Sequence, residues 1–211
     1  MRNNKNYFRL SLLFFLAFLI WTALVSFADV QPIGPQGSSV GLATLNGGFH
    51  ALTGVNFTLY TVTDWLGLVP LLTCLGFGSL GLWQWVKRKH IQSVDPSILI
   101  LGGFYILVAA VFVFFEVVVV NFRPVLIEGV LEASYPSSTT LLTMCVMPTA
   151  MWQLRLRMRN TLFKRCTLAA IAAFTCFMVI GRLLSGVHWL TDIIGGALLS
   201  TSLVLLYCAF I

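Results

Sequence analysis

The sequence predicts an all-α fold, a polytopic membrane helix bundle of six transmembrane helices with a short interfacial helix after the first span. Hydrophobic residues make up 58% of the 211-residue chain and charged residues only 9%, whereas a soluble domain contains about 25% charged residues. Long apolar runs recur along the chain, and most approach the ~20 residues that cross a bilayer as a helix. Basic residues gather in short clusters between these runs, as is typical of membrane topology signals.

The apolar runs predict one integral membrane domain over residues 1–211. The first run is longer than the ~7–15-residue apolar core of a secretory signal peptide, so we expect it to stay as a helix. Residues 40–60 are too polar to span, and we expect them to lie along the outer interface. Within them, His50 either approaches a functional site or forms a polar tip at the interface. The six expected spans cover about 10–28, 65–86, 96–120, 139–154, 166–181 and 189–211.

The basic residues predict how the chain is oriented. Six spans place both termini on one side of the membrane, and eleven of the thirteen Lys and Arg residues fall on that side, at the N-terminus, at 87–89 and at 155–165. The positive-inside rule assigns this side to the cytoplasm. We therefore expect a multi-pass protein of the plasma (inner) membrane with cytoplasmic N- and C-termini.

Arg123 and Arg182 are the two exceptions, and both fall on the outer side. Two arginines placed against the topological rule predict a shared anionic ligand at the outer mouth of the bundle. The alternative is that each arginine pairs locally, because intramembrane charges often pair structurally. The acids considered for such pairing are Glu116, Glu128 and Asp192.

Several classes of function are disfavoured by composition. The net charge of +6 does not indicate a nucleic-acid partner, because the basic residues are not gathered on one soluble face. All five cysteines lie within or beside apolar runs without C-x-x-C spacing, so we expect neither a disulfide nor a metal site. No cofactor is expected.

The stretch Gly181–Asp192 carries the strongest chemical signal. Arg182 has a permanent charge and a planar donor fork that suits phosphate oxygens. His188 can act as a nucleophile or base, and Asp192 follows it by four residues, so on a helix the two side chains share a face. A carboxylate on one imidazole nitrogen fixes the tautomer and leaves the other nitrogen free to attack. The alternative is that these residues are polar caps on two membrane helices.

These residues resemble a known signature. Gly181-Arg182, His188 and Asp192 have the spacing of the S-R-x5-H-x3-D motif of the type 2 phosphatidic acid phosphatase family, the membrane lipid phosphatases that share their core with vanadium haloperoxidases. Only the leading Ser is changed, to Gly. The first family motif, K-x6-R-P, is similar to Glu116-x6-Arg123-Pro124. The second, P-S-G-H, is similar to Pro136-Ser137-Ser138-Thr139.

The resemblance implies a mechanism that needs no metal. His188 would attack a phosphomonoester or diphosphate and form a phosphohistidine, with Asp192 as its orienting acid. Arg123, Arg182 and Ser137 would hold the phosphate. The main-chain N–H of Ser138 would assist them, because helix starts favour anions. The guanidinium charge would stabilise the pentacoordinate state, and water would then release phosphate.

Two departures from the family pattern bear on the substrate. The family lysine is Glu116 here, and the histidine that resembles a general acid is Thr139. General acid catalysis contributes about 10²–10⁴-fold, and threonine cannot supply a proton at neutral pH. A phosphate leaving group needs this help little, so we expect a lipid diphosphate, such as a polyprenyl diphosphate, to be preferred over phosphatidic acid. Glu116 starts about two helical turns from Arg123, so we expect a structural partner there and not a substitute acid.

Two other functions stay open at the level of sequence. The missing groups also fit a non-catalytic relative that binds or transports lipid phosphates. In a lipid phosphotransferase, an alcohol in place of water would resolve the phosphohistidine. All three readings share a lipid phosphate as ligand and the bilayer as surroundings.

Overall fold

The computed structural model describes residues 2–211 and confirms the all-α membrane fold. No β-strand forms within these residues, only isolated bridges in the loops. The helices are α1 (Arg2–Phe27), α2 (Ala43–Thr53), α3 (Phe57–Leu66), α4 (Leu68–Arg88), α5 (Pro96–Val117), α6 (Ser138–Arg157), α7 (Thr161–Leu184) and α8 (Leu190–Phe210), with short 3-10 turns at Pro35–Gly37 and Ile91–Ser93.

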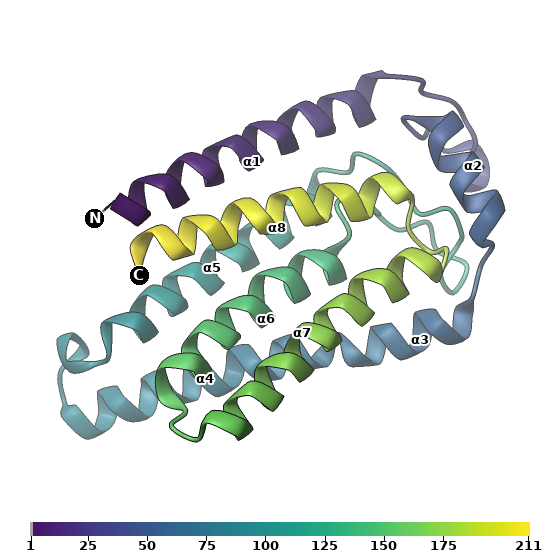
Figure 1. Cartoon of the computed structure of the whole chain (residues 1–211). Coiled ribbons are helices and arrows are strands. Elements are labelled where there is room, and N and C mark those ends of the chain that lie inside the picture. The colour runs from purple at the N-terminus through teal and green to yellow at the C-terminus, as the bar shows by residue number, and fades with distance from the viewer. Residues whose placement is uncertain (1) are drawn as a thin grey trace.

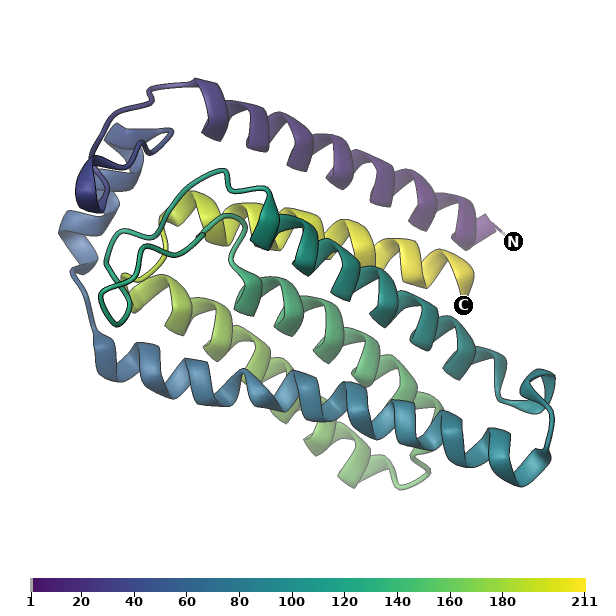
Figure 2. The same ribbon diagram turned by 180° about the vertical axis from the view of Figure 1, so that it is seen from behind.

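Five helical segments of the described chain are long and apolar enough to cross a membrane: Asn4–Phe27, Phe57–Arg88, Pro96–Val117, Thr161–Leu184 and Leu190–Phe210. The expected six-span count is therefore not confirmed. α6, which corresponds to the fourth expected span, runs alongside the others (Figure 2), but its threonines, Gln153 and two arginines lower its hydropathy. Its polar face is buried among neighbouring helices, which membrane proteins tolerate far better than contact with lipid.

The second span begins earlier than the sequence predicts. α3 and α4 continue into one another through Gly67, which has helical backbone angles, and together run from Phe57 to Arg88. The start is fixed by Asn56, whose side chain accepts a hydrogen bond from Leu59 N at 2.9 Å, as an N-cap residue does. Asp64, which directly precedes the predicted start of this span at residue 65, therefore lies inside the helix.

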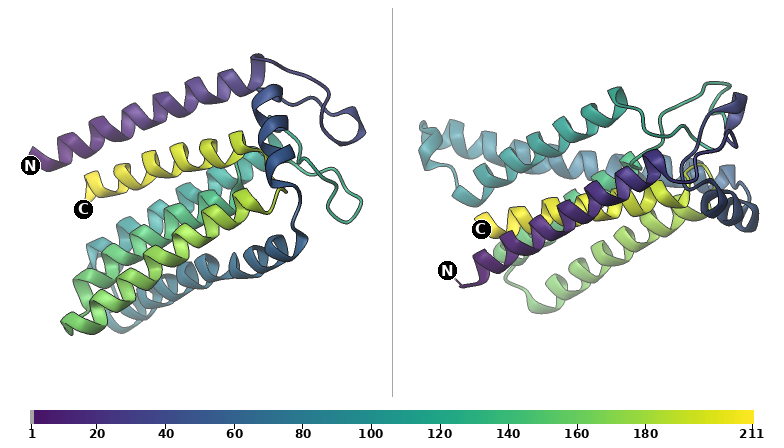
Figure 3. Two further views of the ribbon diagram at one scale, coloured as in Figure 1. Left: turned by 45° about the vertical axis from the view of Figure 1, so that its right-hand side comes forward. Right: turned by 90° about the horizontal axis from the view of Figure 1, so that it is seen from above.

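Both termini lie at one end of the bundle, and α2 lies across the other end (Figures 1 and 3). This short helix is the one expected after the first span. The termini share their end with the α4–α5 and α6–α7 connections, which carry the basic clusters. The α5–α6 connection and the α7–α8 turn lie at the α2 end. The sequence motifs are therefore gathered at the end opposite to most of the positive charge.

The helices are joined by a small core and by polar contacts between α1 and α8. Buried side chains of α1, α5, α6 and α8 meet around Tyr135 of the α5–α6 connection. α1 runs beside α8, where Ser11 Oγ donates to Ser202 O and Ser202 Oγ donates to Ser11 O, both at 2.9 Å. Such small polar residues let membrane helices approach closely. Most large apolar side chains elsewhere are exposed, as expected for a lipid-facing surface.

Candidate active site

The α5–α6 connection and the α7–α8 turn bring the predicted residues together. Arg123 lies on the connection, Arg182 in the last turn of α7, His188 in the turn and Asp192 in the first turn of α8. The connection folds back on itself: Arg123 N donates to Glu132 O at 3.0 Å, and Ser134 N donates to Asn121 O at 2.9 Å. This pairing places the Arg123 and Ser134 side chains on either side of the imidazole.

His188 is 3% exposed, and both of its ring nitrogens have partners. Nε2 lies 3.3 Å from Arg123 Nη1, and Nδ1 lies 3.1 Å from Ser134 Oγ. A guanidinium can only donate, so Nε2 accepts and the ring proton is on Nδ1. Burial, followed by the charges of Arg123 and Arg182, lowers the pKa of His188 well below its usual value. The imidazole is therefore neutral near pH 7, with its lone pair directed at an arginine.

Asp192 is fully buried behind the imidazole, and it is not on a shared helical face with His188 because α8 begins only at Leu190. The direct distance from His188 Nδ1 to Asp192 Oδ2 is 3.6 Å, too long for a hydrogen bond. Oδ2 accepts from Trp189 N at 2.8 Å and from the Ser134 hydroxyl. Among the described residues, Asp192 Oδ1 has no hydrogen-bond partner.

Arg182 is buried and held by residues of two other helices. Its Nε and Nη2 donate to Thr139 Oγ1 at 3.0 and 2.8 Å, and Nη2 also donates to Asp64 Oδ1 at 2.8 Å. The guanidinium carbon lies 4.8 Å from the centroid of the Tyr60 ring. Arg182 is thus ready to hold an anion, but a carboxylate and a hydroxyl now occupy its donors.

Gly181, the position at which the third motif departs from the family, explains why Asp64 reaches Arg182. A Cβ added to Gly181 would lie 2.8 Å from Thr63 Cγ2. Glycine therefore lets α3 pack closely against α7. Because Asp64 follows Thr63, this close approach brings its carboxylate to the arginine.

Arg123 also has an acidic neighbour. Its Nε lies 3.0 Å from Glu132 Oε2, but the N–H is not aligned for a hydrogen bond. Both outer arginines therefore do pair locally, although with Asp64 and Glu132 in place of the three acids considered from the sequence. No ion pair within residues 2–211 involves Glu116, which is exposed in the last turn of α5.

The second-motif residues form the start of α6. Ser137 is the N-cap, and its buried hydroxyl accepts from Thr140 N at 3.4 Å, so it is engaged in capping. Ser138 and Thr139 lie in the first turn, where main-chain N–H groups lack helical acceptors and attract anions. Ser137 N donates to Asp192 O at 3.1 Å, which ties this start to the third motif. The candidate anion site thus lies between a helix N-terminus and two arginines.

Sequence reasoning missed three residues of this site. Ser134 lies two positions before Pro136 and contacts both His188 and Asp192. Asp64 and Glu132 pair with the arginines, but only the packing of α3 on α7 and the folding of the loop bring them there. His50 does approach the site region: its Nε2 lies 3.1 Å from Gly186 O and supports the α7–α8 turn. Within the described residues, no group of three His, Cys, Asp or Glu side chains could hold a metal ion.

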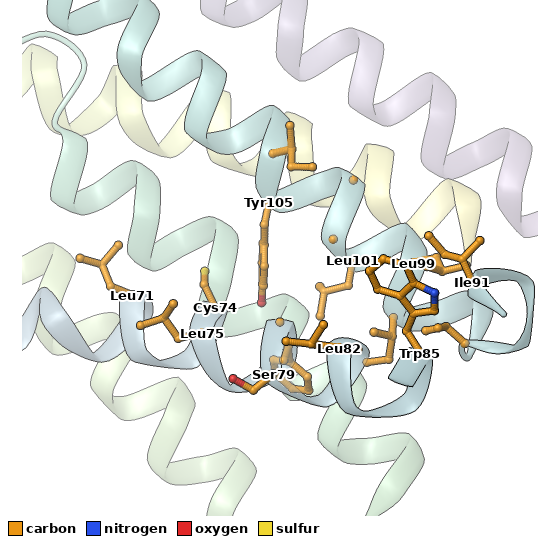
Figure 4. Close-up of a pocket in the computed structure, with 18 residues that line it drawn as sticks. Leu71, Cys74, Leu75, Ser79, Leu82, Trp85, Ile91, Leu99, Leu101 and Tyr105 are labelled. Atoms are coloured by element: carbon orange, nitrogen blue, oxygen red, sulfur yellow. The ribbon is translucent and has the colours of Figure 1, made fainter. Parts of the chain in front are cut away.

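A large apolar groove lies elsewhere. It has a volume of about 980 Å³ between α4 and α5 and is lined largely by aliphatic side chains (Figure 4). Leu71, Leu82, Leu99 and Ile91 are among them, and none of its lining residues is charged. The groove thus lacks the cationic side chains that the polar cluster around His188 contains.

Comparison with known proteins agrees with this geometry. The PAP2 superfamily model matches residues 121–211, which hold Arg123, the second-motif segment and the third motif. No curated protein sequence shows a significant match. The fold is similar to the crystal structure of the first transmembrane PAP2-type phosphatidylglycerolphosphate phosphatase from Bacillus subtilis, with a TM-score of 0.56, 19% identity, and coverage of 94% of this chain and 93% of that one. Residues 121–211 of this chain are therefore similar to the PAP2 superfamily, and the whole chain has the fold of a PAP2-type membrane protein.

Proposed function

We propose that this protein is a membrane lipid phosphatase that hydrolyses a lipid phosphate or diphosphate through a phosphohistidine on His188. The observation that carries the proposal is the neutral imidazole whose Nε2 lone pair faces Arg123, with the charge of Arg182 close enough to lower its pKa. A nucleophile and two permanent cations at one buried point suit attack on a phosphate. The match of residues 121–211 to the PAP2 superfamily model supports the same reaction class.

The geometry supports a two-step reaction. A phosphate bound between Arg123 and Arg182 would take the donors that now face Glu132, Thr139 and Asp64. Nε2 then forms a bond to phosphorus while the bond to the leaving oxygen breaks, and the proton stays on Nδ1. The two guanidinium groups stabilise the charge that develops on the equatorial oxygens. Water attacks the phosphohistidine in the second step and returns the free imidazole.

The position of Thr139 supports a diphosphate as the preferred substrate. Its hydroxyl accepts two hydrogen bonds from Arg182, and its pKa excludes it as a proton donor at neutral pH. A phosphate leaving group departs without general acid, whereas the alkoxide of a phosphatidic acid does not. We therefore favour a polyprenyl diphosphate among lipid diphosphates.

The charge distribution supports a site on the outer side of the plasma (inner) membrane. The basic clusters and both termini share the end opposite to the α7–α8 turn, which contains His188 (Figure 1). The positive-inside rule assigns the basic end to the cytoplasm, so the site end lies outside.

A second candidate, a non-catalytic protein that binds or transports lipid phosphates, is favoured by a different observation. Asp64 and Glu132 already neutralise the two arginines, and Thr139 stands at the position of the family's second-motif histidine. A site of this kind binds an anion reversibly by exchanging one carboxylate for another negative group, without any chemical step.

Phosphate release by the purified protein separates the candidates. We expect vanadate-sensitive release from a polyprenyl diphosphate, slower release from phosphatidic acid, and no release by His188→Ala. His90→Ala is the matched control, because it removes an exposed histidine at the opposite end. Binding without release supports the second candidate, and transfer of phosphate to an added alcohol supports a phosphotransferase. Undiminished release by His188→Ala would refute the proposed mechanism.

A further inference from the structure

We propose that Ser134 is a positioning residue that links His188 to Asp192 and holds the imidazole in its reactive tautomer. The proposal rests on the function proposed above and adds a residue to its site. Ser134 Oγ lies 3.1 Å from His188 Nδ1 and is hydrogen-bonded to Asp192 Oδ2. The direct distance from imidazole to carboxylate is 3.6 Å, so the serine hydroxyl makes the connection that the carboxylate does not.

The donors and acceptors allow only one direction for the hydrogen bonds that run from His188 through Ser134 to Asp192. Arg123 can only donate, which makes His188 Nε2 an acceptor and leaves the ring proton on Nδ1. Nδ1–H then donates to Ser134 Oγ, and the single hydroxyl proton of the serine goes to Asp192 Oδ2. Asp192 receives a second bond at the same oxygen from Trp189 N. Imidazole, hydroxyl and carboxylate thus form an ordered chain from ring to acid.

The surrounding fold fixes the hydroxyl in place. Ser134 is 2% exposed, and its main-chain N–H donates to Asn121 O at 2.9 Å. The next residue, Tyr135, packs on α8 so closely that a Cβ on Gly195 would lie 2.6 Å from its ring. Ser134 therefore cannot move away from His188 without displacing buried groups, as expected of a group that orients a nucleophile.

These hydrogen bonds would stabilise the transition state of the chemical step. As Nε2 forms its bond to phosphorus, the ring gains positive charge and its Nδ1–H becomes a stronger donor. The hydroxyl passes this polarisation to the Asp192 carboxylate, so the interaction is stronger in the transition state than in the ground state. A contact of this kind affects kcat more than KM.

The test compares Ser134→Ala with Ser134→Thr, which keeps the hydroxyl, and with Ser134→Cys, which keeps the size but donates weakly. We expect kcat on a polyprenyl diphosphate to fall about 10- to 100-fold in Ser134→Ala, the cost typical of losing a partner that orients a functional imidazole. KM should change little, and Ser134→Thr should recover most of the loss. Ser202→Ala, which removes a buried hydroxyl between α1 and α8, is the matched control and should match wild type.

A measurement independent of turnover reports the tautomer directly. In ¹⁵N-histidine-labelled protein, the His188 resonances should show Nδ1–H in wild type and a mixture of tautomers in Ser134→Ala, with assignment through His50→Gln and His90→Gln. An Nε2–H tautomer in wild type overturns the proposal. So does wild-type kcat in folded Ser134→Ala or, where that variant does not fold, in Ser134→Cys. If His188→Ala itself keeps activity, the proposed function fails, which is a separate result from the loss of the serine link.

Discussion

At the scale of single residues, the ion pair of Asp64 with Arg182 predicts competition between this carboxylate and a bound anion. Asp64 lies on Arg182 Nη2 at 2.8 Å, and its side chain is 55% exposed. We expect Asp64→Asn to strengthen inhibition by vanadate about two- to fivefold, because solvent screens the exposed Asp64 carboxylate and limits the ion pair to about 1 kcal/mol. The measurement is the vanadate inhibition constant of the purified protein.

The control for this prediction is Glu128→Gln. Glu128 is an exposed acid on the same end of the molecule, and its removal changes the net charge equally without touching an arginine. We expect its inhibition constant to equal that of wild type. Weaker inhibition in Asp64→Asn would mean that Asp64 orients Arg182 and does not compete with the anion.

The environment of His188 predicts a pH dependence. Its pKa is depressed, first by burial and then by Arg123 and Arg182, so the imidazole stays unprotonated below the ordinary value of 6.5. We expect the acid limb of the kcat/KM profile to lie below pH 6.5. The unfolded chain takes up this proton near 6.5 while the folded protein does not, so this histidine lowers stability as the pH falls from 6.5 towards its folded pKa. An acid limb at or above 6.5 contradicts the assigned environment.

The sequence predicted only those site residues that share a motif. Arg182, His188 and Asp192 lie within one short stretch, so their proximity follows from local chain geometry. Ser134, Asp64 and Glu132 carry no motif, because a serine near a proline or a single acid is common in any sequence. Their roles depend on tertiary contacts: the backbone pairing of the α5–α6 connection, and the packing of α3 on α7 that Gly181 permits.

At the scale of elements, the turn between α7 and α8 is positioned by the connection between α2 and α3. Asn56 N donates a hydrogen bond to Ser185 O at 2.9 Å. Gly186 has a φ of +67° and packs directly against the carbonyl group of Gly54. A Cβ at Gly186 would lie 1.9 Å from that carbonyl oxygen. We expect Gly186→Ala to lower both the melting temperature and kcat, because the turn must move away and carry His188 with it.

Gly129→Ala is the control that distinguishes the effect of backbone strain from the effect of the close contact between Gly186 and Gly54. Gly129 also has a positive φ, +80°, but an added Cβ would meet no atom within 4 Å. We expect it to cost only about 1 kcal/mol of stability from the backbone conformation and to leave kcat unchanged. Equal effects of the two substitutions would show that the packing of the turn on Gly54 is unimportant.

The element boundaries show where hydropathy is a poor guide. The sequence predicts the end of α1 within one residue of Phe27, but the helix begins at Arg2, before the predicted start at about residue 10, because the polar residues ahead of the apolar run are also helical. The start of α3 was missed because Asn56, Thr58 and Thr61 lower the hydropathy of a segment that a side-chain cap nevertheless makes helical. The sequence predicts α6 as a span, but α6 is not among the helices apolar enough to cross a membrane by composition. Its buried polar residues pack against other helices and not against lipid, so they need not be apolar.

At the scale of the whole molecule, the two ends of the bundle have different chemistry. The end with the termini carries the basic clusters, and Gln84 and Asp95 join α4 to the start of α5 there through two hydrogen bonds of 2.9 Å. The other end carries the two remaining arginines, balanced by Asp64 and Glu132. This asymmetry leaves the α2 end without excess positive charge, so we expect an anion there to be held by specific donors and not by a general field.

The same asymmetry predicts which end of the protein is outside the cell. Glu128 lies in the exposed loop at the site end, and Lys89 lies at the exposed C-terminus of α4 at the basic end. We expect Glu128→Cys to react with a membrane-impermeant maleimide in intact cells, and Lys89→Cys to react only after the membrane is permeabilised. Wild type provides the background from the five native cysteines. The reverse pattern would place His188 on the cytoplasmic side. The cationic clusters would then lie outside the cell, against the positive-inside rule.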